Sequence, residues 1–297
     1  MSDSQNYGDM GRHRPQHGSG DDNDADTQVL PAQGRGGGRG LVAVEDEVHT
    51  VQVKNVRKAF GSFKVLQGLN LNFVDNAVTT ILGPSGTGKS VLLKHIVGLL
   101  APDAGEVIVF DQDIWKISEI ERQELRKRFG VLFQDGALFG SMNIYDNVAF
   151  PLRKHTNKRE SEIRDIVMTR LDEVGLTKAI HKAPGEVSGG MKKRAGFARA
   201  LVLNPSVVMF DEPDSGLDPV RTALLNELIL KMHDEHGGTY VLVTHDISTA
   251  RRVSDYVGVL WQGELVHYGP AEEAFNSPDP FVRQFLSGQP TGPLGMD

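Results

Sequence analysis

The pattern of apolar and polar positions predicts short strands that alternate with helices. Residues 48–53 alternate apolar and polar side chains with a period of two, which is typical of a half-buried strand. Leu69, Leu71 and Phe73 repeat this period in a second strand. Short apolar runs predict further strands at 77–82, 206–211 and 239–244, and a hairpin at 257–267 that turns at Gln262-Gly263.

Helical periodicity appears between these strands. In residues 159–175, Ile163, Val167 and Leu171 share one face, and Gly175 stands where a left-handed C-terminal cap is expected. Further helical stretches are predicted at 91–97, 191–203 and 224–233. Strands that alternate with helices indicate a layered α/β fold with a largely parallel sheet.

The two ends of the chain differ from this pattern. Residues 1–46 combine acidic clusters with the run GRGGGRG and have almost no apolar periodicity, so we expect a disordered acidic and glycine-rich tail. Residues 268–297 form a C-terminal extension in which Phe281, Phe285 and Leu286 follow a short helical pattern. We interpret these apolar residues as packing groups and not as a ligand site.

Composition narrows the classes of protein. Lys and Arg number 32 against 39 Asp and Glu, a net charge of −7 that argues against a nucleic-acid partner. Cysteine is absent, which excludes disulfides and thiolate metal sites. No stretch approaches the roughly 18–20 apolar residues that span a bilayer. A secreted mini-protein and an integral membrane protein are therefore not expected, whereas a subunit of a membrane machine remains open.

The strongest local motif follows the predicted strand at 77–82. Its sequence matches G-x-x-x-x-G-K-[ST] at every constrained position and precedes a helical run. Glycines in such a loop let backbone N–H groups face phosphate oxygens, the lysine adds a positive charge near the β- and γ-phosphates, and the serine hydroxyl suits Mg²⁺. The motif consists of Gly83, Pro84, Ser85, Gly86, Thr87, Gly88, Lys89 and Ser90.

A pair of acids ends the apolar run at 206–210. Asp211 stands where P-loop proteins orient the metal through its water shell. Glu212 follows at once, and its carboxylate is placed to polarise a water in line with the γ-phosphate. The two motifs together predict a nucleoside triphosphatase.

Further motifs stand between and after these two. Gln134 follows the apolar run 131–133, Ser188-Gly189-Gly190 precedes a helix, Asp218 lies in SGLD, and His245 follows the strand at 239–244. In this order the motifs resemble those of the ATP-binding-cassette (ABC) ATPases, from about residue 48 to 267. The resemblance implies an ATPase domain at 47–267, an α/β P-loop NTPase with a RecA-like core and mostly parallel sheet. It also implies an antiparallel β-subdomain and a helical subdomain at about 112–204.

The resemblance also implies roles for single residues. In this family the SGG segment holds the γ-phosphate of ATP bound on the opposite subunit, so a homodimer with ATP and Mg²⁺ is expected. Phe60 is the expected adenine contact, with Phe63 as its competitor. The expected catalytic residues are Glu212, His245, Gln134 and Lys89, and the expected metal-binding residues are Ser90, Gln134 and Asp211. The expected nucleotide-binding residues are Phe60, Gly83, Pro84, Ser85, Gly86, Thr87, Gly88, Lys89, Ser90, Val91, Ser188, Gly189, Gly190 and Asp218.

Two segments resemble one subgroup of the family more closely. The SGG triplet is followed by Met191 and a basic stretch, and the acid pair opens the run DEPDSGLDP. Val187 and Met191 replace the usual Leu and Gln of the signature, which removes one polar contact and leaves the SGG donors. These features resemble the ATPases of Mce/Mla-type lipid transporters, and specifically the actinobacterial Mce-associated ATPase.

This subgroup implies a function in lipid transport. The chain would be a peripheral subunit at the cytoplasmic face of the inner membrane that hydrolyses ATP to power lipid or sterol uptake. Its expected partners are YrbE-like integral membrane permease subunits and Mce substrate-binding proteins. Phe139 and Met142, in an apolar region after Gln134, are the expected contacts with the permease, although such residues also fit an ordinary helical core.

Other functions remain possible at this point. The same motifs suit an importer of an amino acid or a metal. A soluble cassette protein that acts on nucleic acid or ribosomes is disfavoured, because the chain has one P-loop, no long coiled-coil insertion and a net charge of −7. An ordinary P-loop kinase or GTPase would lack the SGG segment.

Overall fold

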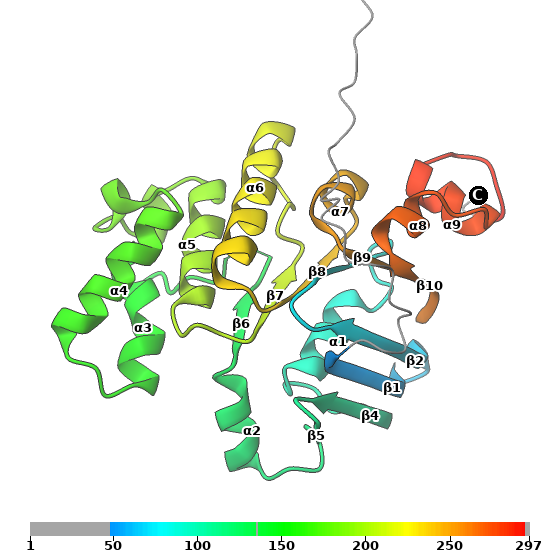
Figure 1. Ribbon diagram of the computed structural model, residues 1–297, viewed down its shortest axis with the longest axis horizontal. Helices are drawn as coiled ribbons and strands as arrows, with labels where there is room; N and C mark the ends of the chain where they lie inside the picture. Colours follow the sequence, from blue (N-terminus) through cyan, green and yellow to red (C-terminus); the bar gives the residue numbers. More distant parts are fainter. Residues whose placement is uncertain (1–47, 135, 295–297) are drawn as a thin grey trace, which may run out of the picture. The chain divides into compact units, whose positions relative to one another are not determined.

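Two sheets form the centre of the part that the computed structural model describes, residues 48–134 and 136–294 (Figure 1). The smaller sheet is antiparallel, in the order β2 (Phe63–Val74), β1 (His49–Phe60), β4 (Ala104–Val109) and β5 (Gln112–Asp113). The larger sheet has the order β10 (Glu264–Pro270), β9 (Tyr256–Trp261), β3 (Val78–Leu82), β8 (Thr239–Thr244), β7 (Val207–Asp211) and β6 (Phe129–Leu132). Its pairs are parallel except β10 with β9.

Helices stand between the strands in the chain and after the last of them. Short polar side chains cap the starts of six of the helices, and each accepts a backbone N–H from the first helical turn: Ser118, Asn143, Ser188, Asp218, Asp246 and Asp279. The helices are α1 (Lys89–Ile96), α2 (Glu119–Arg126), α3 (Ile144–His155), α4 (Glu160–Glu173), α5 (Gly189–Leu201), α6 (Pro219–His236), α7 (Ile247–Val253), α8 (Ala271–Phe275) and α9 (Pro280–Ser287). None of the helices at 48–134 and 136–294 is long and apolar enough to cross a membrane.

Side chains of the larger sheet are buried on both of its faces. In β8, Val241 and Val243 join a core with α1 and the antiparallel sheet, whereas Tyr240 and Leu242 join a core with α5 and α6. The side chains of β7 alternate between the same two cores. Burial on both faces explains the continuous apolar runs, because a parallel sheet is covered by helices or another layer on each side.

The predicted strands and helices are confirmed, and two strands are longer than predicted. The runs at 77–82, 206–211 and 239–244 correspond to β3, β7 and β8, and the hairpin at 257–267 to β9 and β10. β1 and β2 each extend over 12 residues. Their pairing contains register shifts, which break the strict alternation of apolar positions that the sequence pattern depends on.

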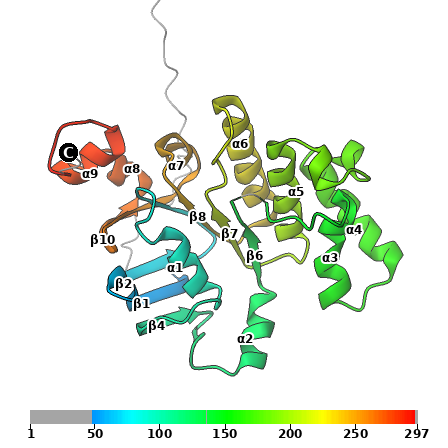
Figure 2. The same cartoon turned by 180° about the vertical axis from the view of Figure 1, so that it is seen from behind.

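The stretch 112–204 contains more than helices. α3, α4 and α5 share a core of their own, seen together on the left of Figure 1 and on the right of Figure 2. The same stretch includes β6, the edge strand of the larger sheet, and β5 of the smaller one. At Gly130 a Cβ atom would lie 2.3 Å from the carbonyl oxygen of Ala200, so this glycine lets α5 pack directly on β6.

The two ends of the chain have separate outcomes. The expected tail at 1–46 falls outside the described residues. The C-terminal helices α8 and α9 pack on β9 and α7, with Val282 and Leu286 buried in that core. The ring of Phe281 meets Trp261 edge-on, with 5.4 Å between ring centroids. The expectation that these apolar residues serve packing is confirmed.

We predict that Phe197→Ala lowers the free energy of unfolding by about 3–5 kcal/mol. Phe197 is fully buried, and its ring lies edge-on to Phe210 at 5.1 Å, so truncation opens a cavity between α5 and β7. Urea denaturation of the nucleotide-free protein measures the loss. Phe63→Ala is the matched control, because Phe63 is 64% exposed, and its effect should stay within about 0.5 kcal/mol. Equal losses in both variants would contradict this packing.

Candidate functional site

The loop between β3 and α1 surrounds a lysine ammonium. Lys89 is the first residue of α1, and its Nζ donates to the carbonyl oxygens of Gly83 and Pro84, each at 2.8 Å. Gly88 has φ 102, and a Cβ atom there would lie 2.9 Å from Leu66 Cδ2, so this position favours glycine. The buried ammonium and the free N–H groups at the start of α1 form a site suited to phosphate oxygens.

The remaining expected loop residues lie around this lysine. Thr87 donates its hydroxyl hydrogen to Pro84 O at 2.9 Å, which closes the loop on itself. Ser85 and Gly86 are exposed at its tip. Val91 is half-buried and packs against the core beneath α1. The structure thus gathers the predicted segment 83–91 into one strand-loop-helix unit.

Glu212 and His245 lie next to this loop. Glu212 Oε1 is 3.8 Å from Lys89 Nζ and 3.7 Å from His245 Nδ1. Burial lowers the pKa of Lys89, and the negative charges of Glu212 and Asp211 oppose that shift. The three predicted residues come from α1, the end of β7 and the end of β8, and the sheet brings them together.

Two oxygen ligands for a metal stand beside each other. Ser90 Oγ donates to Asp211 Oδ1 at 2.7 Å. Burial raises the pKa of Asp211, and the Ser90 hydroxyl hydrogen bond opposes this rise. A hydroxyl and a carboxylate are oxygen donors of the kind that Mg²⁺ takes in nucleotide sites, so this pair fits the predicted ion.

Gln134 contacts the segment that follows Glu212. Its Nε2 donates to Ser215 Oγ at 3.1 Å. The contact joins the residue after β6 to the loop between β7 and α6. The Gln134 side chain is exposed, and its amide contacts this loop. Among the hydrogen bonds of the described residues, none joins Gln134 to Asp211 or Ser90.

The SGG segment and Asp218 occupy the starts of two helices. Ser188 accepts from the N–H of Met191 at the start of α5, and Asp218 accepts from the N–H of Arg221 at the start of α6. Ser188, Gly189 and Asp218 are exposed. α5 and α1, the helices that follow the SGG segment and the phosphate loop, lie apart in both views (Figures 1 and 2).

The expected adenine and permease contacts are partly exposed side chains. Phe60 ends β1, pairs with Phe63 across the hairpin and is 51% exposed, with Lys58 Nζ 5.6 Å from its ring centroid. Phe139 is 43% exposed, and its ring packs on Phe150 with 4.9 Å between centroids. Met142, which precedes α3, is half-buried.

Sequence reasoning missed two buried polar residues close to the site. Asp214 is buried and accepts from the hydroxyl of Thr244 at 2.6 Å, and burial raises the pKa of this carboxyl group. Lys193 is also buried, and its ammonium donates to carbonyl oxygens of the segment that follows β7. Asp214 lies within DEPDSGLDP, which could have drawn attention to it. Nothing in the sequence separates buried Lys193 from its neighbour Lys192.

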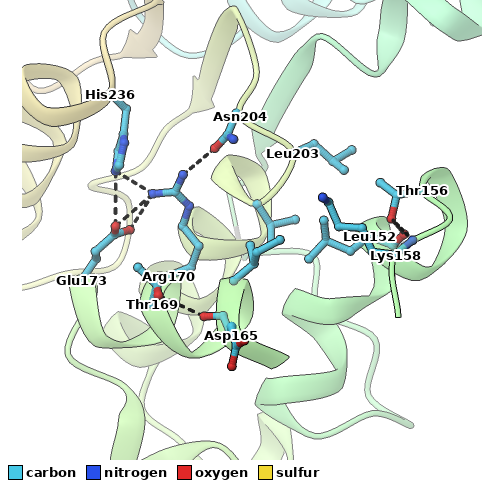
Figure 3. A pocket seen from close by; sticks show the side chains of 12 residues that line it. Leu152, Thr156, Lys158, Asp165, Thr169, Arg170, Glu173, Leu203, Asn204 and His236 are labelled. Carbon is cyan, nitrogen blue, oxygen red and sulfur yellow. Dashed lines mark hydrogen bonds and ion pairs between the residues drawn. The ribbon is translucent and has the colours of Figure 1, made fainter. Parts of the chain in front are cut away.

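A pocket of about 490 Å³ lies where α4 meets the ends of α5 and α6 (Figure 3). None of the residues that line it belongs to the predicted site. Arg170 Nη1 donates to Glu173 Oε2 at 2.8 Å and lies 2.6 Å from His236 Nε2. Arg170 Nη2 donates to Asn204 Oδ1. These bonds tie α4 to the ends of two other helices, so we interpret the cluster as a structural link.

Comparisons with known proteins identify the family of the chain. A family model described as "ABC transporter" matches residues 66–215. The chain is 54% identical over 246 residues to the "Probable ribonucleotide transport ATP-binding protein mkl" of Mycobacterium leprae, covering 83% of this chain and 71% of that protein. It is 41% identical over 244 residues to the "Intermembrane phospholipid transport system ATP-binding protein MlaF" of Haemophilus influenzae, covering 82% of this chain and 92% of that protein.

Solved structures show the same fold. The dimeric ATP-binding cassette MJ0796, in a post-hydrolysis state bound to ADP and Pi, matches with a TM-score of 0.69 and 30% identity, over 74% of this chain and 98% of that one. The cbiO1 protein of Clostridium perfringens matches with a TM-score of 0.72 and 31% identity, over 82% of this chain and 97% of that one. The predicted fold class and the predicted ATPase activity are confirmed. The chain belongs to the ABC transporter family, as an ATP-binding subunit that hydrolyses ATP.

Proposed function

We propose that this ATPase powers phospholipid transport as a homodimer docked beneath the permease of an Mce-type system. The observation that carries the cargo is the 41% identity to the phospholipid transport protein MlaF of Haemophilus influenzae, over 92% of that protein's length. The run DEPDSGLDP and the SGGM segment with its basic residues support the same assignment. The cytoplasmic face of the membrane is the proposed location.

A second cargo follows from the other relatives. The Mycobacterium leprae protein, at 54% identity, carries the name of a probable ribonucleotide transport protein. The residues assigned to ATP would serve either cargo equally, so they do not distinguish the two. Phospholipid and ribonucleotide are therefore the two cargoes that an experiment must separate, and we favour phospholipid.

Nucleotide binding is assigned to the loop 83–91 with Phe60. The N–H groups at the start of α1 and the ammonium of Lys89 would hold the β- and γ-phosphates. The exposed ring of Phe60 offers a flat apolar face on which adenine can stack. Ser90, Asp211 and Gln134 would hold Mg²⁺, which when bound neutralises part of the phosphate charge.

Hydrolysis is assigned to Glu212. Its carboxylate lies beside Lys89 and His245, so a water at the γ-phosphate would give its proton to Glu212 while Lys89 stabilises the charge that develops on the phosphate oxygens. His245 would contact the γ-phosphate from the end of β8. Gln134 would orient the water from the loop after β6.

The dimer is assigned to the exposed helix starts. The N–H groups at Ser188, Gly189 and Gly190, together with the positive end of the α5 dipole, suit a phosphate that another subunit presents. Asp218, exposed at the start of α6, would contact the partner's phosphate loop. ATP would then lie between two copies of the chain, which explains why one chain leaves these helix starts open to solvent.

We predict that Glu212→Gln lowers the ATPase rate at least roughly 100-fold, because the amide cannot take the proton from water. ATP binding should persist, so light scattering should detect an ATP-dependent dimer. Lys89→Ala should instead lose ATP affinity in calorimetric titration. Glu272→Gln, at an exposed position in α8, is the matched control and should hydrolyse ATP at the parent rate. Rapid hydrolysis by the Glu212→Gln protein would refute the assignment of the base.

We predict that Phe139→Asp releases the permease and leaves ATP affinity unchanged. A carboxylate in place of this exposed ring would oppose burial against an apolar partner surface. Co-purification with the permease from detergent-solubilised membranes measures the release. Val266→Asp is the control, because Val266 has a similar exposure of 39% but lies on β10. If the permease stayed bound to the Phe139→Asp protein, the docking surface would lie elsewhere.

We predict that phospholipid, and not ribonucleotide, stimulates the ATPase of the assembled transporter. The tagged chain is purified from membranes of its own host, the co-purifying subunits are identified by mass spectrometry, and ATPase activity is measured with either cargo added. Recovery of YrbE-like permease and Mce-type chains with stimulation by phospholipid is the expected result. Stimulation by ribonucleotide alone, or recovery of ribosomes in place of a permease, would overturn the assignment of phospholipid as the cargo.

A further inference from the structure

A buried lysine connects α5 to the segment after β7. Lys193, 5% exposed, donates from Nζ to Pro213 O at 2.8 Å, to Glu212 O at 3.4 Å and to Ser215 O. An ammonium group has three hydrogens and no acceptor, so three carbonyl oxygens match its hydrogen-bonding capacity. Burial of a charge is unfavourable without such partners, which makes the contact specific and not incidental.

The same face of α5 holds the loop that follows Gln134. Arg199 donates from its guanidinium to Gly136 O at 2.9 Å and to Ala137 O at 2.8 Å. Between the two cations, a Cβ atom at Gly196 would lie 2.9 Å from Gly136 O, so the helix backbone approaches this loop closely. Positions 193, 196 and 199 are three apart and therefore share one side of the helix. α5 is thus fixed to the loops that follow Gln134 and Glu212.

Glu212 needs support of this kind. Its backbone has φ 47, in the left-handed region that residues other than glycine rarely adopt. Its N–H donates to Val243 O at 2.9 Å, and its carbonyl oxygen accepts from Lys193. The peptide groups on both sides of the Glu212 Cα atom are therefore hydrogen-bonded, the first to Val243 and the second to Lys193 and to the Ser215 N–H, which donates to the same carbonyl oxygen at 3.2 Å. Such conformations persist where the surrounding structure determines them, and they are common at functional sites.

We propose that Lys193 is a positioning residue for Glu212. Its ammonium fixes the backbone from 212 to 215, which sets the direction of the Glu212 carboxylate toward the γ-phosphate. Ser215, whose carbonyl oxygen it binds, also accepts a hydrogen bond from Gln134, so the lysine orders both residues that are assigned to the attacking water. Ser188 is the N-cap residue of α5, so the same contact links the helix start that is assigned to phosphate binding with Glu212, the proposed base. This inference rests on the proposed role of Glu212 as the base.

Lys193→Met tests the proposal in the full-length chain. Methionine has a similar length and no donor, so the carbonyl groups of 212–215 lose their partner. We expect kcat for ATP hydrolysis to fall roughly 10- to 100-fold, since small displacements of a catalytic group have effects of this size. KM for ATP and the dissociation constant of ADP should change by less than about threefold, because the loss concerns the transition state. Lys193→Arg, which keeps the charge and the donors, should recover part of kcat.

The controls separate positioning from general damage to the fold. Lys192→Met removes the same charge from the neighbouring half-buried position and should keep the parent kcat. Combined with Glu212→Gln, Lys193→Met should lower the residual rate no further, since the residue acts through that carboxylate. The doubly substituted protein should still dimerise with ATP. Lys193→Gln is the second variant if the methionine protein does not fold.

Three outcomes would overturn the proposal. The first is that Lys193→Met and Lys193→Gln both keep the parent kcat, and the second is that Lys192→Met loses as much activity as Lys193→Met. The third is a rate of the doubly substituted protein that falls by the same factor as in the single variant. Failure of the proposed base is a separate result, because it appears as parent-like hydrolysis by Glu212→Gln alone.

Discussion

The parallel pairing of β3, β7 and β8 is the constraint on which the site depends. In this register Leu82 lies opposite Thr244 and Asp211 opposite Val243, so the three strands end at the same edge. The phosphate loop, the acid pair and His245 each follow one of these ends. Residues separated by more than a hundred positions in the chain therefore meet within a few ångströms, as the ion pair of Lys89 with Glu212 shows. The ladder is held by strands whose side chains are buried on both faces.

The same edge concentrates charge where water is scarce. Burial lowers the pKa of Lys89 and raises the pKa of Asp211 and Asp214. Each of these groups has polar partners: the ammonium has two loop carbonyls, Asp211 has the Ser90 hydroxyl, and Asp214 has the Thr244 hydroxyl. Groups of opposite charge held at fixed positions in a half-buried site respond strongly to the negative charge of a triphosphate, because the local dielectric is low. This is the arrangement that phosphoryl transfer requires.

α5 has two functions in this architecture. Its start presents Ser188 to solvent, where a second subunit would place its nucleotide, and its buried face carries Lys193 and Arg199 to the loops after β7 and β6. Phe197, on the same helix, packs edge-on against Phe210 of β7. The aromatic contact and the two cations thus join the helix that follows the SGG segment to the loops of Gln134 and Glu212.

The sequence alone determined the fold class and predicted most residues of the candidate site. Continuous apolar runs predicted β3, β7 and β8, because strands buried on both faces leave that signature, and the phosphate-loop pattern fixed the residues from Gly83 to Ser90. The order of motifs then led to the family. Short-range patterns carried this information, since each motif is local in the chain and needs little context to be recognised.

Only the tertiary structure decided how these motifs are connected. Two neighbouring lysines look the same in the sequence, yet Lys193 is buried on three carbonyl oxygens and Lys192 is half-buried. The pairing of Asp214 with Thr244, and the membership of β6 in the larger sheet within a stretch expected to be helical, were likewise set by packing. The physical reason is common to all three. Whether a polar side chain or a short strand is buried depends on partners distant in the chain, and no local pattern specifies which partner arrives.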